Sequence, residues 1–114
     1  MPLFQSETSI AAATQVDNLL AGSQWEFLPY NARIDFGIVG DANAADLRVD
    51  VYSGSDALCE SLQPSAANRM PQTDTDYTLV DVAAAGERLK VRARNLNAAA
   101  ARTVFLGVRI TPIG

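Results

Sequence analysis

Apolar and polar residues alternate along several short segments of this chain, most regularly between Glu87 and Asn95. A period of two indicates a β-strand with one buried face. Leu89, Val91 and Ala93 are therefore expected to point into a core. The opposite face carries a row of four cations, which we call the basic row: Arg88, Lys90, Arg92 and Arg94. Like charges on one strand face repel one another, so the basic row is expected either to be solvated or to face a partner. A solvated row would pair with acids on other exposed strand faces, such as Asp35 or Asp50.

Similar short segments recur from residue 24 onward and are separated by turn-forming residues. They cover approximately residues 24–30, 32–39, 47–52, 57–60, 77–82 and 102–110. In the last of these segments, Phe105 is expected to point outward, away from the predicted core face of Val104, Leu106, Val108 and Ile110. Six or seven short strands without a long helical period predict an all-β fold, either an antiparallel β-sandwich or a jelly-roll-like barrel.

The first 22 residues do not show this alternation. Small and polar residues dominate there, which favours a flexible or extended N-terminal arm with a short strand near Val16 to Leu20. A length of 114 residues suits one domain. We therefore predict an arm over residues 1–22 and a single β-sandwich domain over 23–114. Residues 61–75 form the one long irregular segment, and long loops in compact domains are often functional.

The chain contains no histidine and a single cysteine, Cys59. The commonest general base and the commonest metal ligand are thus absent, and no disulfide can form within the chain. Carboxylates are the only candidate catalysts left. The acidic stretches at 41–43 and 74–76 do not match the spacing of a calcium-binding loop. We expect no enzyme activity, no catalytic residue, no metal site and no cofactor.

Charge is distributed unevenly along the chain, whose overall net charge is −4. Residues 1–84 hold twelve acids against three bases, whereas residues 85–114 hold one acid against six bases. The two parts could lie side by side in one sheet, or the basic part of one copy could meet the acidic part of another. A nucleic-acid partner is not expected, because the pI is about 4.6 and no aromatic residue interleaves the basic row.

No apolar run approaches the roughly 20 residues that a transmembrane helix needs. The first residues also lack the basic and apolar regions of a secretory signal. The sequence therefore predicts neither a membrane segment nor a signal peptide.

Three segments, residues 27–37, 83–90 and 99–112, resemble small all-β structural proteins of bacterial viruses that decorate or cement a capsid. The resemblance spans roughly residues 20–112 and is one of architecture, without a diagnostic motif. It implies a non-enzymatic virion protein, assembled in the host cytoplasm, that forms a homo-oligomer and binds a major capsid protein.

The outward-facing groups supply the candidate interface for such an assembly: Arg88, Lys90, Arg92, Arg94 and Phe105. The alternative is a ligand-binding β-sandwich, such as a carbohydrate-binding or receptor-binding module. In that case aromatic side chains would stack on the ligand, with the 61–75 loop as the rim of the site; for Trp25 the alternative is packing in the core. The candidates for stacking are Trp25, Tyr30, Tyr52 and Tyr77.

Overall fold

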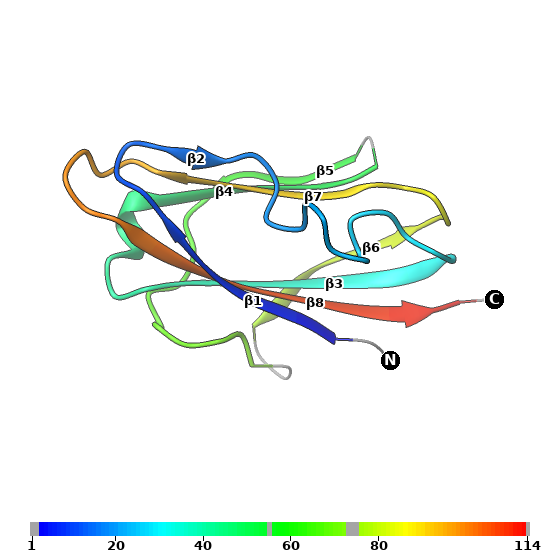
Figure 1. Ribbon diagram of the computed structural model, residues 1–114. Coiled ribbons are helices and arrows are strands. Elements are labelled where there is room, and N and C mark those ends of the chain that lie inside the picture. Colours follow the sequence, from blue (N-terminus) through cyan, green and yellow to red (C-terminus); the bar gives the residue numbers. More distant parts are fainter. Residues whose placement is uncertain (1–2, 55, 73–75, 114) are drawn as a thin grey trace.

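Two four-stranded antiparallel sheets make up the protein in the computed structural model, which describes residues 3–54, 56–72 and 76–113 (Figure 1). The strands are β1 (Leu3–Ile10), β2 (Gln15–Val16), β3 (Ala32–Gly40), β4 (Leu47–Ser53), β5 (Asp56–Leu62), β6 (Tyr77–Ala83), β7 (Leu89–Asn95) and β8 (Arg102–Pro112). A single 3₁₀ turn, η1 (Ala44–Asp46), precedes β4. The predicted all-β, antiparallel architecture is confirmed.

The strand order is β1-β8-β3-β6 in the first sheet, which we call sheet 1, and β2-β7-β4-β5 in the second, sheet 2. Every strand pair is antiparallel. The two sheets lie face to face, and the ends of the chain emerge at the same end of the molecule (Figure 1). Among the described residues no strand pairing joins sheet 1 to sheet 2, so the architecture is a sandwich and not a closed barrel.

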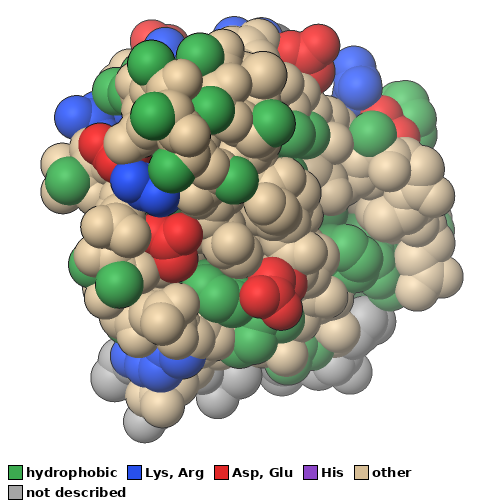
Figure 2. All heavy atoms as spheres, turned by 60° about the vertical axis from the view of Figure 1, so that its left-hand side comes forward, with side chains coloured by type: hydrophobic (Ala, Val, Ile, Leu, Met, Phe, Trp, Pro, Cys, Tyr) green, Lys and Arg blue, Asp and Glu red, His purple; other side chains and the backbone are tan. Residues whose placement is uncertain are grey.

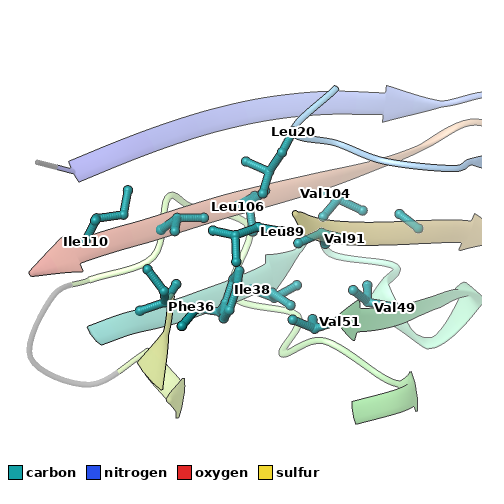
Figure 3. Packing of buried hydrophobic residues seen from close by; sticks show 14 of the residues in the cluster. Leu20, Phe36, Ile38, Val49, Val51, Leu89, Val91, Val104, Leu106 and Ile110 are labelled. Carbon is teal, nitrogen blue, oxygen red and sulfur yellow. The ribbon is translucent and has the colours of Figure 1, made fainter. Parts of the chain in front are cut away.

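The core lies between the sheets and follows the predicted period of two (Figure 3). Leu89, Val91 and Ala93 of β7 are completely buried. In β8 the same is true of the four predicted positions, Val104, Leu106, Val108 and Ile110. Phe36 is the largest fully buried side chain, and Figure 3 shows it beside Ile38 in the middle of the cluster. Alternation therefore identified the inward face of each central strand correctly.

The predicted N-terminal arm is not an arm over residues 3–10. This segment forms β1, which pairs with β8 along its whole length, from Leu3 opposite Arg109 to Ile10 opposite Arg102. The strand predicted near Val16 to Leu20 is reduced to the two residues of β2. The inward side of β1 is partly polar, with Ser6 and Thr8 between Phe4 and Ile10, which explains why its sequence lacks a hydrophobic alternation.

The segment from Trp25 to Tyr30, predicted as a strand, is instead part of a long connection between β2 and β3. It makes one isolated bridge, between Phe27 and Arg88. Asn18 anchors the beginning of this connection, because its buried side chain donates to the Leu89 carbonyl at 3.2 Å and accepts from the Val91 amide at 3.1 Å. The Asn18 side chain thus takes the place of a strand partner for β7 beyond the end of β2.

The predicted irregular segment at 61–75 begins two residues later than expected, because β5 runs to Leu62. Its described part first runs beside the end of β3, where Ser65 forms a parallel bridge with Val39, and Pro71 then lies against Gly37 on the outer face of sheet 1. The Ser65 carbonyl accepts from the Gly40 amide at 2.8 Å, and the Asn68 amide donates to the Gly40 carbonyl at 2.9 Å. Residues 73–75 of the predicted segment, and Asp74 and Thr75 of the acidic stretch, lie outside the described residues.

Candidate functional site

The basic row lies on the outer face of sheet 2, as the alternation predicts. Strand β7 lies between β2 and β4, but β2 pairs only with Ala93 and Arg94. Lys90, Arg92 and Arg94 are half-buried. Their cross-strand neighbours on β4 are Tyr52 opposite Lys90, Asp50 opposite Arg92, and Arg48 opposite Arg94.

Two cations of the basic row have carboxylate partners. Arg88 Nε donates to Glu26 Oε2 at 2.9 Å, and Arg94 donates to Asp50 Oδ1 at 3.4 Å and to Ser61 Oγ at 2.8 Å. The sequence-based expectation that Asp50 would pair with this row is thus confirmed.

The other acid expected to pair with the row, Asp35, does not do so, because it lies on sheet 1. It accepts there from Arg33 at 3.3 Å and from Arg109 at 3.1 Å. Asp35 is 2 % exposed, although the alternation placed it on an exposed face. Two guanidinium groups therefore neutralise a carboxylate that strand periodicity alone assigns to solvent.

A surface hollow of about 410 Å³ opens beside the start of β7. It is lined by Tyr52, Gly54, Arg88, Lys90 and Arg92. The Lys90 ammonium lies 6.0 Å from the centroid of the Tyr52 ring, within the range of a cation–π contact. Three of the five lining residues are cations, so the hollow is suited to a negatively charged group.

Phe105 is not part of this site. It lies on β8 in sheet 1, opposite Val39 of β3 and Glu7 of β1, and it faces away from the core as predicted, since it is absent from the inter-sheet cluster. However, Phe105 is only 9 % exposed and Val39 only 1 %. Neither side chain is therefore an apolar anchor on the surface of the isolated chain.

The four aromatic residues considered for ligand stacking lie in three places. Trp25 and Tyr30 pack against the core and against each other, with ring centroids 6.3 Å apart and an interplanar angle of 62°. Tyr77 lies across Gly107 on sheet 1, with its ring 5.4 Å from the Arg109 guanidinium carbon. Tyr52 alone lines the hollow of sheet 2, so the four do not form one stacking surface.

Two further acids, Asp46 and Asp41, have structural partners. Asp46 Oδ2 accepts from Asn97 at 3.1 Å and from Arg102 at 3.0 Å, and these hydrogen bonds, Asn97 first, hold the pKa of the Asp46 carboxyl below its ordinary value of 3.8. Asp41 accepts from the Thr103 amide at 2.8 Å and from the Asn43 amide at 2.9 Å. Within the described ranges no three metal-ligating side chains gather.

Cys59 lies on β5, where its thiol is half-buried and 3.8 Å from the Val49 carbonyl oxygen. Burial raises the pKa of this thiol. A raised pKa keeps the sulfur protonated at neutral pH, and the thiolate is the nucleophilic form. Cys59 is thus a small, half-buried residue of β5 without the features of a nucleophile.

Away from the hollow, charges of both signs are mixed. On the side of the molecule that Figure 2 brings forward, acidic and basic side chains are interspersed. In the parts of the chain that the structure describes, no helix has the length and apolarity to cross a membrane.

Comparison with known proteins gave no match to a family model, to a curated protein or to a solved structure. No residue role is therefore transferred from a relative.

Sequence reasoning identified the basic row and Tyr52 separately but did not bring them together. The available signal was the register of β4 on β7, since Tyr52 and Arg48 share the face of β4 that carries Asp50. Gly54 was interpreted only as part of a turn. It lines the hollow because it follows β4 directly, at the end where β7 begins.

Proposed function

We propose that this chain is a non-enzymatic structural protein of a bacterial virus, a jelly roll that oligomerises and binds or stabilises a capsid shell. The observation that carries the proposal is the strand order, β1-β8-β3-β6 facing β2-β7-β4-β5. A jelly roll consists of eight antiparallel strands in two facing sheets, and most strands that follow one another in the chain lie in opposite sheets, as they do here. Viral capsid proteins are a major group with that fold.

Two surfaces of the chain could take part in assembly. The first is the basic row, whose half-buried cations favour a negatively charged partner. The second is the outer face of β6, an edge strand of sheet 1, on which Val80 and Val82 are 46 % and 63 % exposed. Exposed valines beside an open sheet edge suit pairing with another chain.

The first test is the mass of the purified chain in solution, measured by light scattering at low and high salt. A symmetric oligomer that loosens as salt rises supports assembly through the basic row, because screening weakens charge pairing between subunits. The same protein should co-sediment with capsid shells that lack it. A salt-independent monomer that fails to co-sediment at high concentration contradicts the proposal.

A ligand-binding module is the second candidate, and the hollow on sheet 2 favours it. Jelly rolls are also used by lectins, and small-ligand sites combine an aromatic surface with a few convergent polar groups. Tyr52 with Lys90 and Arg92 is such a combination. Binding to a glycan array by the native chain but not by a Tyr52→Ala variant would support this candidate, and binding by neither protein would remove it.

A further inference from the structure

The cations that line the hollow differ in their partners. Arg88 is ion-paired with Glu26 at 2.9 Å. Lys90 and Arg92 form no salt bridge with a carboxylate of the described residues. Two positive charges therefore line one depression without an ion pair to a described carboxylate, and both would attract an anion that entered it.

Arg92 provides the second observation. Its Nε is buried and has no hydrogen-bond partner among the described atoms. Asp50 lies directly opposite on β4, but its carboxylate accepts instead from Arg94 and from the Ser61 amide. Arg94 Nε is also buried without a partner among the described atoms although Arg94 does not line the hollow, so the distinguishing feature of Arg92 is that its side chain lines the hollow without an ion pair.

The acids around the hollow do not fill this role. Glu26 is held by Arg88. The Glu87 carboxylate lies against Gly54 at the rim, where a Cβ added at position 54 would be 2.9 Å from Glu87 Oε2. Neither acid forms an ion pair with Lys90 or Arg92 in the described chain. The volume of about 410 Å³ is at the lower end of the range for small-ligand sites.

We propose that this hollow is a binding site for the oxyanion group, carboxylate or phosphate, of a small ligand. Lys90 and Arg92 donate charge-assisted hydrogen bonds to the oxyanion, and the Tyr52 ring borders the remainder of the ligand. The proposal rests on the second candidate function, the ligand-binding module, and names the ligand chemistry for that site. It does not depend on a capsid partner.

The experiment is a titration of the whole chain, followed by the backbone amide NMR signals of β4 and β7. The probes are inorganic phosphate, glucuronate as a monosaccharide carboxylate, and glucose as the neutral counterpart of glucuronate. Saturable shifts around Tyr52 and Arg92 are expected with the two anions and not with glucose. The tighter-binding anion then identifies whether the natural group is a phosphate or a sugar carboxylate.

Arg92→Met and Lys90→Met remove one charge each while keeping much of the side-chain length, and each should weaken anion binding about tenfold or more. The matched control is Arg48→Met, which removes a charge from the same face of sheet 2 without lining the hollow. Its affinity should equal that of the native chain. Unfolding curves of all three variants verify that they are folded, and either hollow variant suffices for the test.

Three results would overturn the inference. Shifts that stay linear with anion concentration indicate an ion atmosphere and no site. Equal losses in Arg48→Met and Arg92→Met indicate general electrostatics. If glucose binds as tightly as glucuronate, the oxyanion is not what the site recognises, but the ligand-binding function remains supported. If the shifts are linear and the glycan array also shows no binding, both the oxyanion site and the ligand-binding function are rejected.

Discussion

Asp50 and Arg92 face each other across β4 and β7, yet the Asp50 carboxylate accepts from Arg94 and from the Ser61 amide, the latter at 2.7 Å. The acid therefore links β4 to β5 and to the far end of β7. Because Asp50 pairs with Arg94 and not with Arg92 directly opposite, Arg92 has no ion pair among the described residues. Asp50 therefore has a structural role and does not neutralise the cations that line the hollow.

Asp50→Asn should destabilise the fold by about 1–3 kcal/mol, because it weakens hydrogen bonds to a buried carboxylate and leaves Arg94 uncompensated. Asp50 is 4 % exposed. The measurement is the free energy of unfolding in urea. Asp56→Asn, an exposed acid at the start of β5, is the matched control and should change stability by no more than about 0.5 kcal/mol. Equal effects of the two substitutions would contradict the role given to Asp50.

Leu89→Ala should cost about 2–5 kcal/mol, since it removes a fully buried side chain and leaves a cavity between the sheets. Leu96→Ala makes the same chemical change at a residue that is 56 % exposed, and we expect a loss within about 0.5 kcal/mol. Denaturant unfolding monitored by Trp25 fluorescence compares the two. Similar midpoints for both variants would mean that Leu89 is not in the core.

Gly107→Ala should destabilise sheet 1 by about 1–3 kcal/mol through overpacking. A Cβ at position 107 would lie 2.6 Å from Cζ of Tyr77, whose ring covers this glycine. In a Tyr77→Ala background the same substitution should cost much less, because the ring is no longer present. Unfolding free energies of the four proteins give the coupling energy, and additive losses would show that Tyr77 does not occupy this position.

Asp46 should titrate below its ordinary pKa of 3.8, because Asn97 and Arg102 donate hydrogen bonds to its ionised form. A lowered folded-state pKa means that this contribution to stability is present above pH 3.8 and disappears as the pH falls through the folded value. The carboxyl carbon NMR signal of Asp46 reports the titration directly.

Asn97→Ala should move the Asp46 pKa upward. Asn43→Ala is the control, because Asn43 precedes the same turn without a side-chain cap hydrogen bond and should leave the titration unchanged. An Asp46 titration that is the same in the native chain and in Asn97→Ala would rule out this cause of the shift.

The fold class and the inward faces of β3, β4, β7 and β8 could be predicted because apolar side chains occupy every second position along each of these strands. Strand β1 could not, since Ser6 and Thr8 occupy its inward side. Phe105 was placed on the correct face, but strand periodicity contains no information about whether that face is covered. For the same reason the basic row could be predicted, whereas its division into paired and unpaired cations depends on where Glu26 and Ser61 lie.

The pairing of β1 with β8 also determines the order in which the molecule can form. Leu3 lies opposite Arg109, so β1 leaves the ribosome long before its strand partner has been synthesised. Closing such a long loop costs entropy before any contact is gained, and folds with distant strand pairs are slow to form. In the meantime β1 has no strand partner on any nascent copy, and an unpaired strand edge is prone to pair with another chain.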